Sequence, residues 1–311
     1  MTKLIVIGFL LGIAFCMPSQ AATNADDFLN SVHSAKAFSL GQSLGMVNHL
    51  DAALLNPAEF YVKTPKQQVL LSYSNDFSEE QKMQVGYSMP IQYSPFRVGV
   101  VYMSQQISNV PEVEKSSGDP EIVGYFENKN EAVKILSAYQ VNPNLSIGAN
   151  LIVLRETIKT ASGMGYGADF GLVYRLLETE SLKIAFSNAV RNVSFAGFKV
   201  PIQWSGKDYT EAIPATFQTA LAISGKLMGN PTIVSLGFNT EITRLKLNPN
   251  VGLNYSIIHS QNFACDLRGG LNGAFLTFGV GINWVGLGLD YGYGVHDYLG
   301  NSHRVSLKLD F

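Results

Sequence analysis

Large apolar residues alternate with small or polar residues along most of this sequence. The clearest runs are Leu276, Phe278, Val280, Ile282 and Trp284, then Leu287, Leu289, Tyr291, Tyr293 and Val295, then Val305, Leu307 and Leu309. The positions between them hold mostly Gly, Ser, Thr, Asn or Asp. A period of two residues predicts β-strands whose two faces meet different surroundings.

The chemistry of the two faces favours a membrane barrel over a soluble sandwich. A soluble sheet would turn its bulky face to a core and present Lys and Glu to water. Here the second face is small and weakly charged, which suits the interior of a barrel, while the bulky face suits contact with lipid. Within hydrocarbon every backbone group must be paired, and a closed barrel achieves this because it has no free edge.

About fourteen segments show this pattern, which predicts a transmembrane antiparallel β-barrel over residues 67–311 in an all-β fold class. They lie near 67–75, 82–92, 95–107, 131–140, 145–158, 164–176, 181–190, 214–227, 231–244, 249–258, 262–270, 274–284, 286–295 and 302–311. With residue 67 at the periplasmic rim, the short turns fall on the periplasmic side. The two long connections, 108–130 and 191–213, then both fall outside, as expected for bacterial barrels.

Composition excludes two other classes of protein. Charged residues make up 15% of the 311 residues and the net charge is −2, whereas about 25% charge is usual for soluble domains. After residue 16 no apolar run approaches the roughly 18 residues of a spanning helix, so a helical membrane protein is excluded. With no Lys or Arg cluster, nucleic-acid binding is also excluded.

Residues 1–21 predict export. Lys3 precedes an apolar stretch over 4–16, and small residues at 19 and 21 suit cleavage of a Sec signal peptide after Ala21. The rival, a lipid anchor on Cys16, is disfavoured because Phe15 stands where a small residue is expected. We therefore expect the mature chain in the bacterial outer membrane, in contact with its lipid. The terminal aromatic residue, Phe311, is the candidate signal for the barrel-assembly machinery.

Residues 22–66 do not alternate, and about 45 residues ahead of the first strand predict a hatch or plug inside the barrel. Within them, segment 40–46, Asp51-Ala-Ala and Asn56-Pro57-Ala58 resemble the opening of the FadL/PorV/PorQ superfamily of outer-membrane barrels. The segments 289–293 and 299–307 are similar to the last hairpin of its PorV/PorQ branch.

This resemblance implies a fourteen-stranded barrel with an N-terminal hatch. The implied hatch motif is Leu44, Gly45, Met46, Asn56, Pro57 and Ala58. The chain departs from the family pattern at Asn48-His49, where small residues prevail, and at Glu59, where Gly often follows Asn-Pro-Ala.

The resemblance also implies three alternative functions. FadL-type members take up hydrophobic small molecules passively, which is our first hypothesis. PorV-type members serve type IX secretion by carrying or releasing cargo, so the second is a secretion-associated shuttle or scaffold with secretion-system partners. The third is a structural barrel with a plugged lumen. Inward glycines such as Gly279 and Gly292 leave room for either a channel or a docked hatch, and docking is the favoured interpretation.

The sequence predicts no enzyme, no cofactor and no metal site. Its five histidines are scattered without metal-ligand spacing. His303 follows Asn301 and Ser302 directly, and adjacent residues cannot supply a convergent triad. Gly163, Gly165 and Gly167, spaced by two, mark the inner face of a strand rather than a phosphate loop.

Two sets of residues remain as candidate sites. Inward Asp169, Glu241, Asp266, Arg268 and Asp290 form either interior ion pairs, the favoured interpretation, or a polar ring that selects solutes. The connection 191–213 carries the aromatic residues Phe195, Phe198, Trp204 and Tyr209. These predict either a surface that binds a ligand or partner, or a loop that folds inward and caps the barrel.

Overall fold

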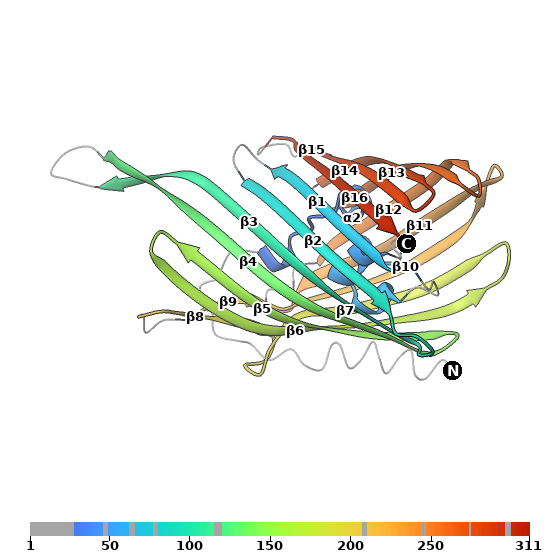
Figure 1. The fold of residues 1–311 in the computed structure, drawn as a ribbon, viewed down its shortest axis with the longest axis horizontal. Helices are drawn as coiled ribbons and strands as arrows, with labels where there is room; N and C mark the ends of the chain where they lie inside the picture. The colour runs from blue at the N-terminus through green and yellow to red at the C-terminus, as the bar shows by residue number, and fades with distance from the viewer. Residues whose placement is uncertain are drawn as a thin grey trace.

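The chain forms a closed barrel of fourteen antiparallel strands (Figure 1). The computed structural model describes residues 28–45, 49–61, 66–76, 80–114, 120–206, 210–243, 245, 247–273, 275–295 and 300–311. The predicted signal peptide lies outside this part of the chain. The barrel strands are β1 (Gln68–Asp76), β2 (Glu80–Pro90), β3 (Phe96–Glu114), β4 (Glu121–Asn142), β5 (Leu145–Ile158), β6 (Ala161–Glu178), β7 (Lys183–Val193), β10 (Thr216–Leu227), β11 (Asn230–Glu241), β12 (Leu247–His259), β13 (Phe263–Asn272), β14 (Phe275–Trp284), β15 (Leu287–Val295) and β16 (Ser302–Asp310).

Antiparallel pairing continues around the whole ring. Each barrel strand pairs with the next, β7 pairs with β10, and β16 returns to β1 with Gln68 opposite Asp310. The predicted all-β barrel and its strand number are therefore confirmed. We call the end with the β2–β3, β4–β5 and β6–β7 connections the short-turn end, and the opposite end the long-loop end. Phe311 lies at the short-turn end, where its backbone pairs with Gln67 and its side chain is exposed.

The two faces of each strand differ as the alternation predicts. On β14 the side chains of Leu276, Phe278 and Val280 are exposed on the outer wall, while Thr277 between them is buried inside. The outer wall is thus a continuous apolar surface, as contact with lipid requires. Among the described residues, no helix has the length and apolar character needed to cross a membrane.

Both predicted long connections are wrong in part, because they contain strands. β3 and β4 continue far beyond β2 and β5 as a two-stranded hairpin that projects from the long-loop end (Figure 1). Pro111 and several charged residues obscure the alternation there, but a hairpin exposed on both faces needs no strict alternation. The second connection contains β8 (Lys199–Trp204) and β9 (Thr210–Pro214), which pair with each other. β8 also pairs with the N-terminal part of β6.

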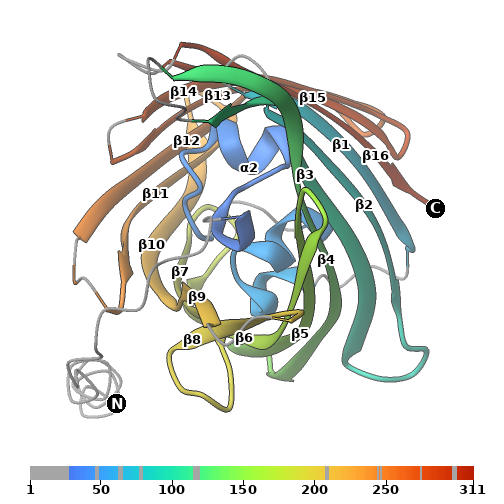
Figure 2. The same cartoon turned by 90° about the vertical axis from the view of Figure 1, so that its left-hand side faces the viewer.

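Residues 28–45 and 49–61 of the N-terminal segment lie inside the ring of strands (Figure 2). They contain η1 (Phe28–Asn30), α2 (Ala35–Ser39), η2 (Leu50–Leu54) and η3 (Pro57–Phe60). Ser34 caps α2 by accepting the amide of Ala37, as N-cap serines do. Such short helices are marginal alone, so contacts with the wall stabilise this segment. We call residues 28–45 and 49–61 the hatch.

The hatch contacts the wall most closely at inward glycines. A Cβ at Gly270 of β13 would overlap the backbone nitrogen of Gly41, and a Cβ at Gly148 of β5 would overlap the carbonyl of Pro57. Gly279 likewise faces Ser39 of α2. Gly41 itself has φ +64° and a Cβ there would lie 2.6 Å from the Leu271 carbonyl. These glycines therefore accommodate the hatch rather than an open channel.

We predict that Gly270→Ala loosens the hatch, because the added methyl collides with hatch backbone. The expected loss of hatch-docking free energy is about 1–3 kcal/mol, which is typical of overpacking. Limited proteolysis of residues 28–61 in the detergent-solubilised barrel measures how far the hatch has loosened. Gly269→Ala on the same strand is the matched control, since nothing lies within 4 Å of a Cβ there. Equal proteolysis of the two variants would contradict this account of the close contact.

Candidate functional site

Asn56 makes three hydrogen bonds, one within the hatch and two to the wall. Its Oδ1 accepts the amide of Ala58 at 2.9 Å and so caps η3. Its Nδ2 donates to Ser187 Oγ on β7 at 2.7 Å and to the Leu172 carbonyl on β6 at 3.3 Å. Gly171 lies directly beneath Asn56 Oδ1, where a larger residue would displace the side chain. Asn56 therefore acts as a positioning residue for the hatch.

The other residues of the predicted hatch motif lie around this point. Leu44 is fully buried, and Pro57 and Ala58 lie over Gly148 and are buried too. Gly45 has φ +78° and a Cβ there would overlap Ala222 of β10. Met46 lies outside the described residues.

Glu59 is a buried carboxylate that binds neutral donors. Its Oε1 accepts the amide of Gly45 at 2.6 Å and a very short hydrogen bond from Ser187 Oγ. Its Oε2 is buried without a hydrogen-bond partner among the described residues. Burial raises the pKa of Glu59 to about 7, although these hydrogen bonds act in the opposite direction. Glu59 thus joins two hatch segments to β7 at the cost of burying a titratable group.

We predict that the docked hatch weakens as pH rises. A carboxyl whose pKa is raised stabilises the docked state fully below its ordinary value of 4.5, and this stabilisation is lost as pH rises through about 7. At 1.36 kcal/mol per unit the difference is about 3 kcal/mol. Native-state hydrogen exchange of the hatch amides, corrected for intrinsic rates, measures it between about pH 5 and pH 8.

Glu59→Gln should abolish that pH dependence because the amide does not titrate. Glu131→Gln is the control: Glu131 binds Tyr102 and Lys129 at the partly exposed surface of β4, so it should retain the wild-type profile. A Glu59→Gln barrel whose hatch still loosens with pH would show that another group is responsible.

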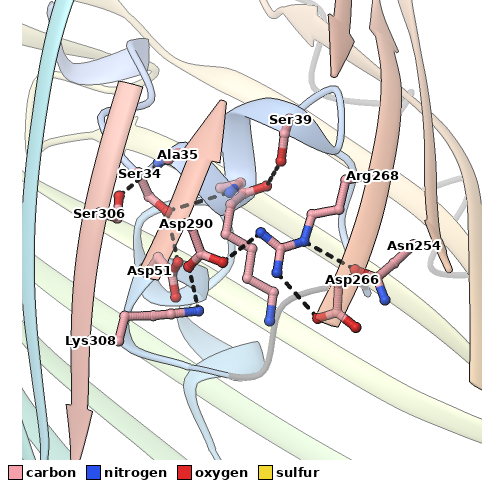
Figure 3. A network of polar contacts seen from close by, with 12 residues as sticks. Ser34, Ala35, Ser39, Asp51, Asn254, Asp266, Arg268, Asp290, Ser306 and Lys308 are labelled. Carbon is pink, nitrogen blue, oxygen red and sulfur yellow. Dashed lines mark hydrogen bonds and ion pairs between the residues drawn. The ribbon is translucent and has the colours of Figure 1, made fainter. Parts of the chain in front are cut away.

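A second cluster of polar contacts joins the hatch to the opposite wall (Figure 3). Arg268 of β13 donates to Asp290 of β15 at 2.6 Å and to Asp266 at 3.3 Å. Lys308 of β16 forms an ion pair with the second oxygen of Asp290 at 2.6 Å. All four side chains are buried or nearly so. Breaking one partner of such a buried pair is strongly destabilising, so this cluster fixes the geometry of β13, β15 and β16.

The hatch contributes its own polar groups beside this cluster. Ser34 Oγ donates to Asp51 at 2.7 Å, and the amide of Ala35 donates to Ser306 Oγ on β16 at 2.8 Å (Figure 3). His49 lies 3.3 Å from Asp51 and 3.2 Å from Asp310. Burial alone would raise the pKa of Asp51, but its bond to His49 and nearby positive charges hold it well below its usual range. Asp51 is therefore ionised and neutralised within the hatch–wall contact.

The predicted polar ring is not a single ring. Asp266, Arg268 and Asp290 lie together, as described above. Asp169 lies elsewhere, on β6, and pairs with Lys134 of β4 at 2.9 Å. Glu241 ends β11 at the long-loop end and accepts from Thr243. The candidate charges thus lie in separate local groups rather than in one ring.

The described aromatic residues of connection 191–213 differ in burial. Trp204 is buried with Phe28 and Leu29 of the hatch in one apolar cluster, so this part folds inward. Phe195 is fully exposed and Phe198 is 39% exposed. Tyr209 lies outside the described residues.

The inner-face glycines Gly163, Gly165 and Gly167 leave space for the β8–β9 hairpin. A Cβ at Gly167 would overlap the side chain of Val200, and one at Gly163 would lie 2.7 Å from Ile202. The prediction that these glycines mark an inner strand face agrees with this placement. Sequence reasoning missed Ser187, whose role depends on the fold alone, whereas Glu59 was visible as a departure from the family pattern. The described residues hold no group of three or more His, Cys, Asp or Glu that could bind a metal ion.

Comparisons with known proteins find likeness in structure only. No family model matches the sequence, and no curated protein matches it either. The toluene transporter TodX of Pseudomonas putida superimposes with a TM-score of 0.58 at 10% identity, covering 89% of this chain and 96% of TodX. The toluene transporter TbuX of Ralstonia pickettii gives 0.57 at 10% identity, with 90% and 98% covered.

A FadL homologue of Pseudomonas aeruginosa gives a TM-score of 0.52 at 11% identity, covering 94% of this chain and 99% of the homologue. The match therefore extends over nearly the whole length of each protein. At this low identity it shows the fold and does not extend to the PorV/PorQ branch. The chain has the fold of the FadL-type transport barrels.

Proposed function

We propose that the protein is an outer-membrane channel for passive transport of small hydrophobic compounds. The observation that carries this proposal is an apolar sector on the inner wall, where barrel interiors are usually polar. Leu70, Val101, Met103, Leu136, Ile152 and Leu154 of β1 and β3–β5 are buried facing inward. They form one cluster with hatch residues and with the β8–β9 hairpin.

This sector connects the long-loop end with the hatch. Ile202 and Trp204 of β8 contribute at the mouth, and Phe28, Leu50 and Phe60 contribute from the hatch. A hydrophobic solute that replaced one of these hatch contacts would leave few polar groups unpaired. The similarity of the fold to that of two toluene transporters also supports the proposed transport of hydrophobic compounds. Because the hatch occupies the lumen, passage requires it to shift.

The orientation follows from the connections. We place the short-turn end in the periplasm and the long-loop end outside, as bacterial barrels have short periplasmic turns. Phe311 and the start of β1 then lie on the periplasmic side. A solute would enter beside the β8–β9 hairpin and leave past the hatch.

A secretion-associated scaffold is the second candidate, and one observation favours it. The projecting β3–β4 hairpin exposes Val113, Ile122 and Tyr125, which are 53%, 59% and 67% exposed. Apolar side chains on a structure that extends from the long-loop end are suited to holding a protein at the cell surface.

Uptake by intact cells tests the transport proposal. We expect cells that express the wild-type barrel to accumulate labelled toluene faster than cells carrying the empty vector. The variant Val101→Thr with Met103→Gln keeps the volumes but places polar atoms in the apolar sector. Each buried polar group costs about 1–3 kcal/mol, so uptake should fall by at least about tenfold.

Val100→Thr is the matched control, since Val100 faces outward on the same strand. It should transport like the wild type at equal surface expression. Toluene uptake equal to the empty vector would exclude this proposal. Loss of surface proteins on deletion of the β3–β4 hairpin tip would instead support the scaffold.

A further inference from the structure

A polar chamber lies at the long-loop end of the barrel, above the hatch. Its volume is about 490 Å³, within the roughly 300–1,000 Å³ of small-molecule sites. The hatch forms its floor through Asn30 and Phe38, and strands from both sides of the ring form its walls. None of the described residues that line it has an aliphatic side chain. The chamber therefore differs sharply from the apolar sector of β3–β5.

Carboxamides dominate the lining. The residues of this type are Asn30, Gln42, Gln105, Asn239, Asn248 and Asn272. Hydroxyl groups of Ser31, Thr216, Thr277 and Ser302 accompany them. Carboxamides present both donors and acceptors, so they are suited to bind a ligand that carries both.

The charged groups of the chamber compensate one another. Asp76 accepts from Lys82 at 2.9 Å and from Arg304 at 2.8 Å, and Lys82 also pairs with Glu80 at 3.2 Å. Arg191 and Glu241 complete an equal number of acids and bases. A net charge on a ligand would therefore add little to its binding affinity.

Buried polar atoms at the chamber wall still have no hydrogen-bond partner among the described residues. These atoms are Oδ1 of Asp76 and both Nε and Nη1 of Arg304. The same two side chains are 0% and 5% exposed, and both line the chamber. Leaving such atoms unpaired is costly, so the site favours occupation by a molecule that offers both a donor and acceptors. An apolar solute would leave them unsatisfied.

Phenyl rings border the polar groups. Phe275 of β14 and Phe38 of the hatch line the chamber, and the Arg304 guanidinium lies 3.7 Å from the Phe38 ring centroid. A sugar ring combines a rim of hydroxyl groups with an apolar C–H face. Amides around the rim and an aromatic ring against the face complement both features.

We propose that this chamber binds an uncharged, polyhydroxylated molecule, either a free sugar or the sugar headgroup of a glycolipid. The proposal goes beyond the transport of hydrophobic compounds, because it rests on other residues and another sector of the barrel. Binding here would place a hydroxylated group directly over η1 and α2 of the hatch.

The test uses the purified barrel in an amine-oxide detergent, which has no sugar headgroup. Maltose and n-octyl-β-glucoside are the probes, toluene is the comparison, and saturation-transfer NMR reports binding. We expect the sugar probes to bind. Asn239→Ala with Asn248→Ala should weaken them by about tenfold through the loss of two or more hydrogen bonds.

Asn144→Ala is the matched control, since Asn144 is an exposed residue of the β4–β5 turn at the short-turn end. It should bind like the wild type. Binding of maltose identifies the free sugar as sufficient, and binding of octyl glucoside alone identifies a glycolipid headgroup. Failure of both probes, or binding that the double variant leaves unchanged, overturns the proposal without affecting the toluene experiment.

Discussion

The backbone of the hatch lies directly against the backbone of the barrel wall, and the interior depends on this close approach. Gly41 of the hatch lies against Gly270 of β13, and Pro57 of the hatch lies against Gly148 of β5. With no side chain between them, hatch and wall fill the lumen without a gap at these points. The other interior features, including the buried ion pairs and the apolar sector, are aligned by this docking. The proposed passage through this barrel therefore depends on how firmly the hatch is held.

Buried charges hold one part of the interior more firmly than another. Around Asp290 each carboxylate is matched by Arg268 or Lys308, and such pairs resist rearrangement because separation would leave a buried charge. Glu59 is different, because it binds neutral donors and has a pKa raised to about 7 by burial. The η3 side of the hatch is thus the weaker side. A shift that begins there would open space next to the apolar sector.

Alternation along the chain was sufficient to predict the barrel, its strand number and the outward apolar face, because a period of two residues directly reports which side of a wall a residue faces. It failed for the β3–β4 hairpin tip, which extends beyond the neighbouring strands β2 and β5. It also failed for β8 and β9, whose six and five residues are too short to give a clear pattern. Asp266 and Asp290 pair with Arg268, in line with the expectation of interior ion pairs. Asp169 instead pairs with Lys134, a partner that depends on barrel register. Glycines 163, 165 and 167 were placed on an inner face, while the hairpin they accommodate depends on tertiary packing.

The most direct test of hatch-gated passage is to lock the hatch to the wall. Ser43 Oγ of the hatch lies 2.8 Å from Ser235 Oγ of β11, so Ser43→Cys with Ser235→Cys, in a Cys265→Ser background, places two thiols for a disulfide. Ser235→Cys alone, in the same background, is the control, because it cannot form the disulfide. The account predicts that oxidation abolishes toluene uptake only in the hatch–wall variant and that a reductant restores it. Undiminished uptake through the oxidised, locked barrel would contradict the account.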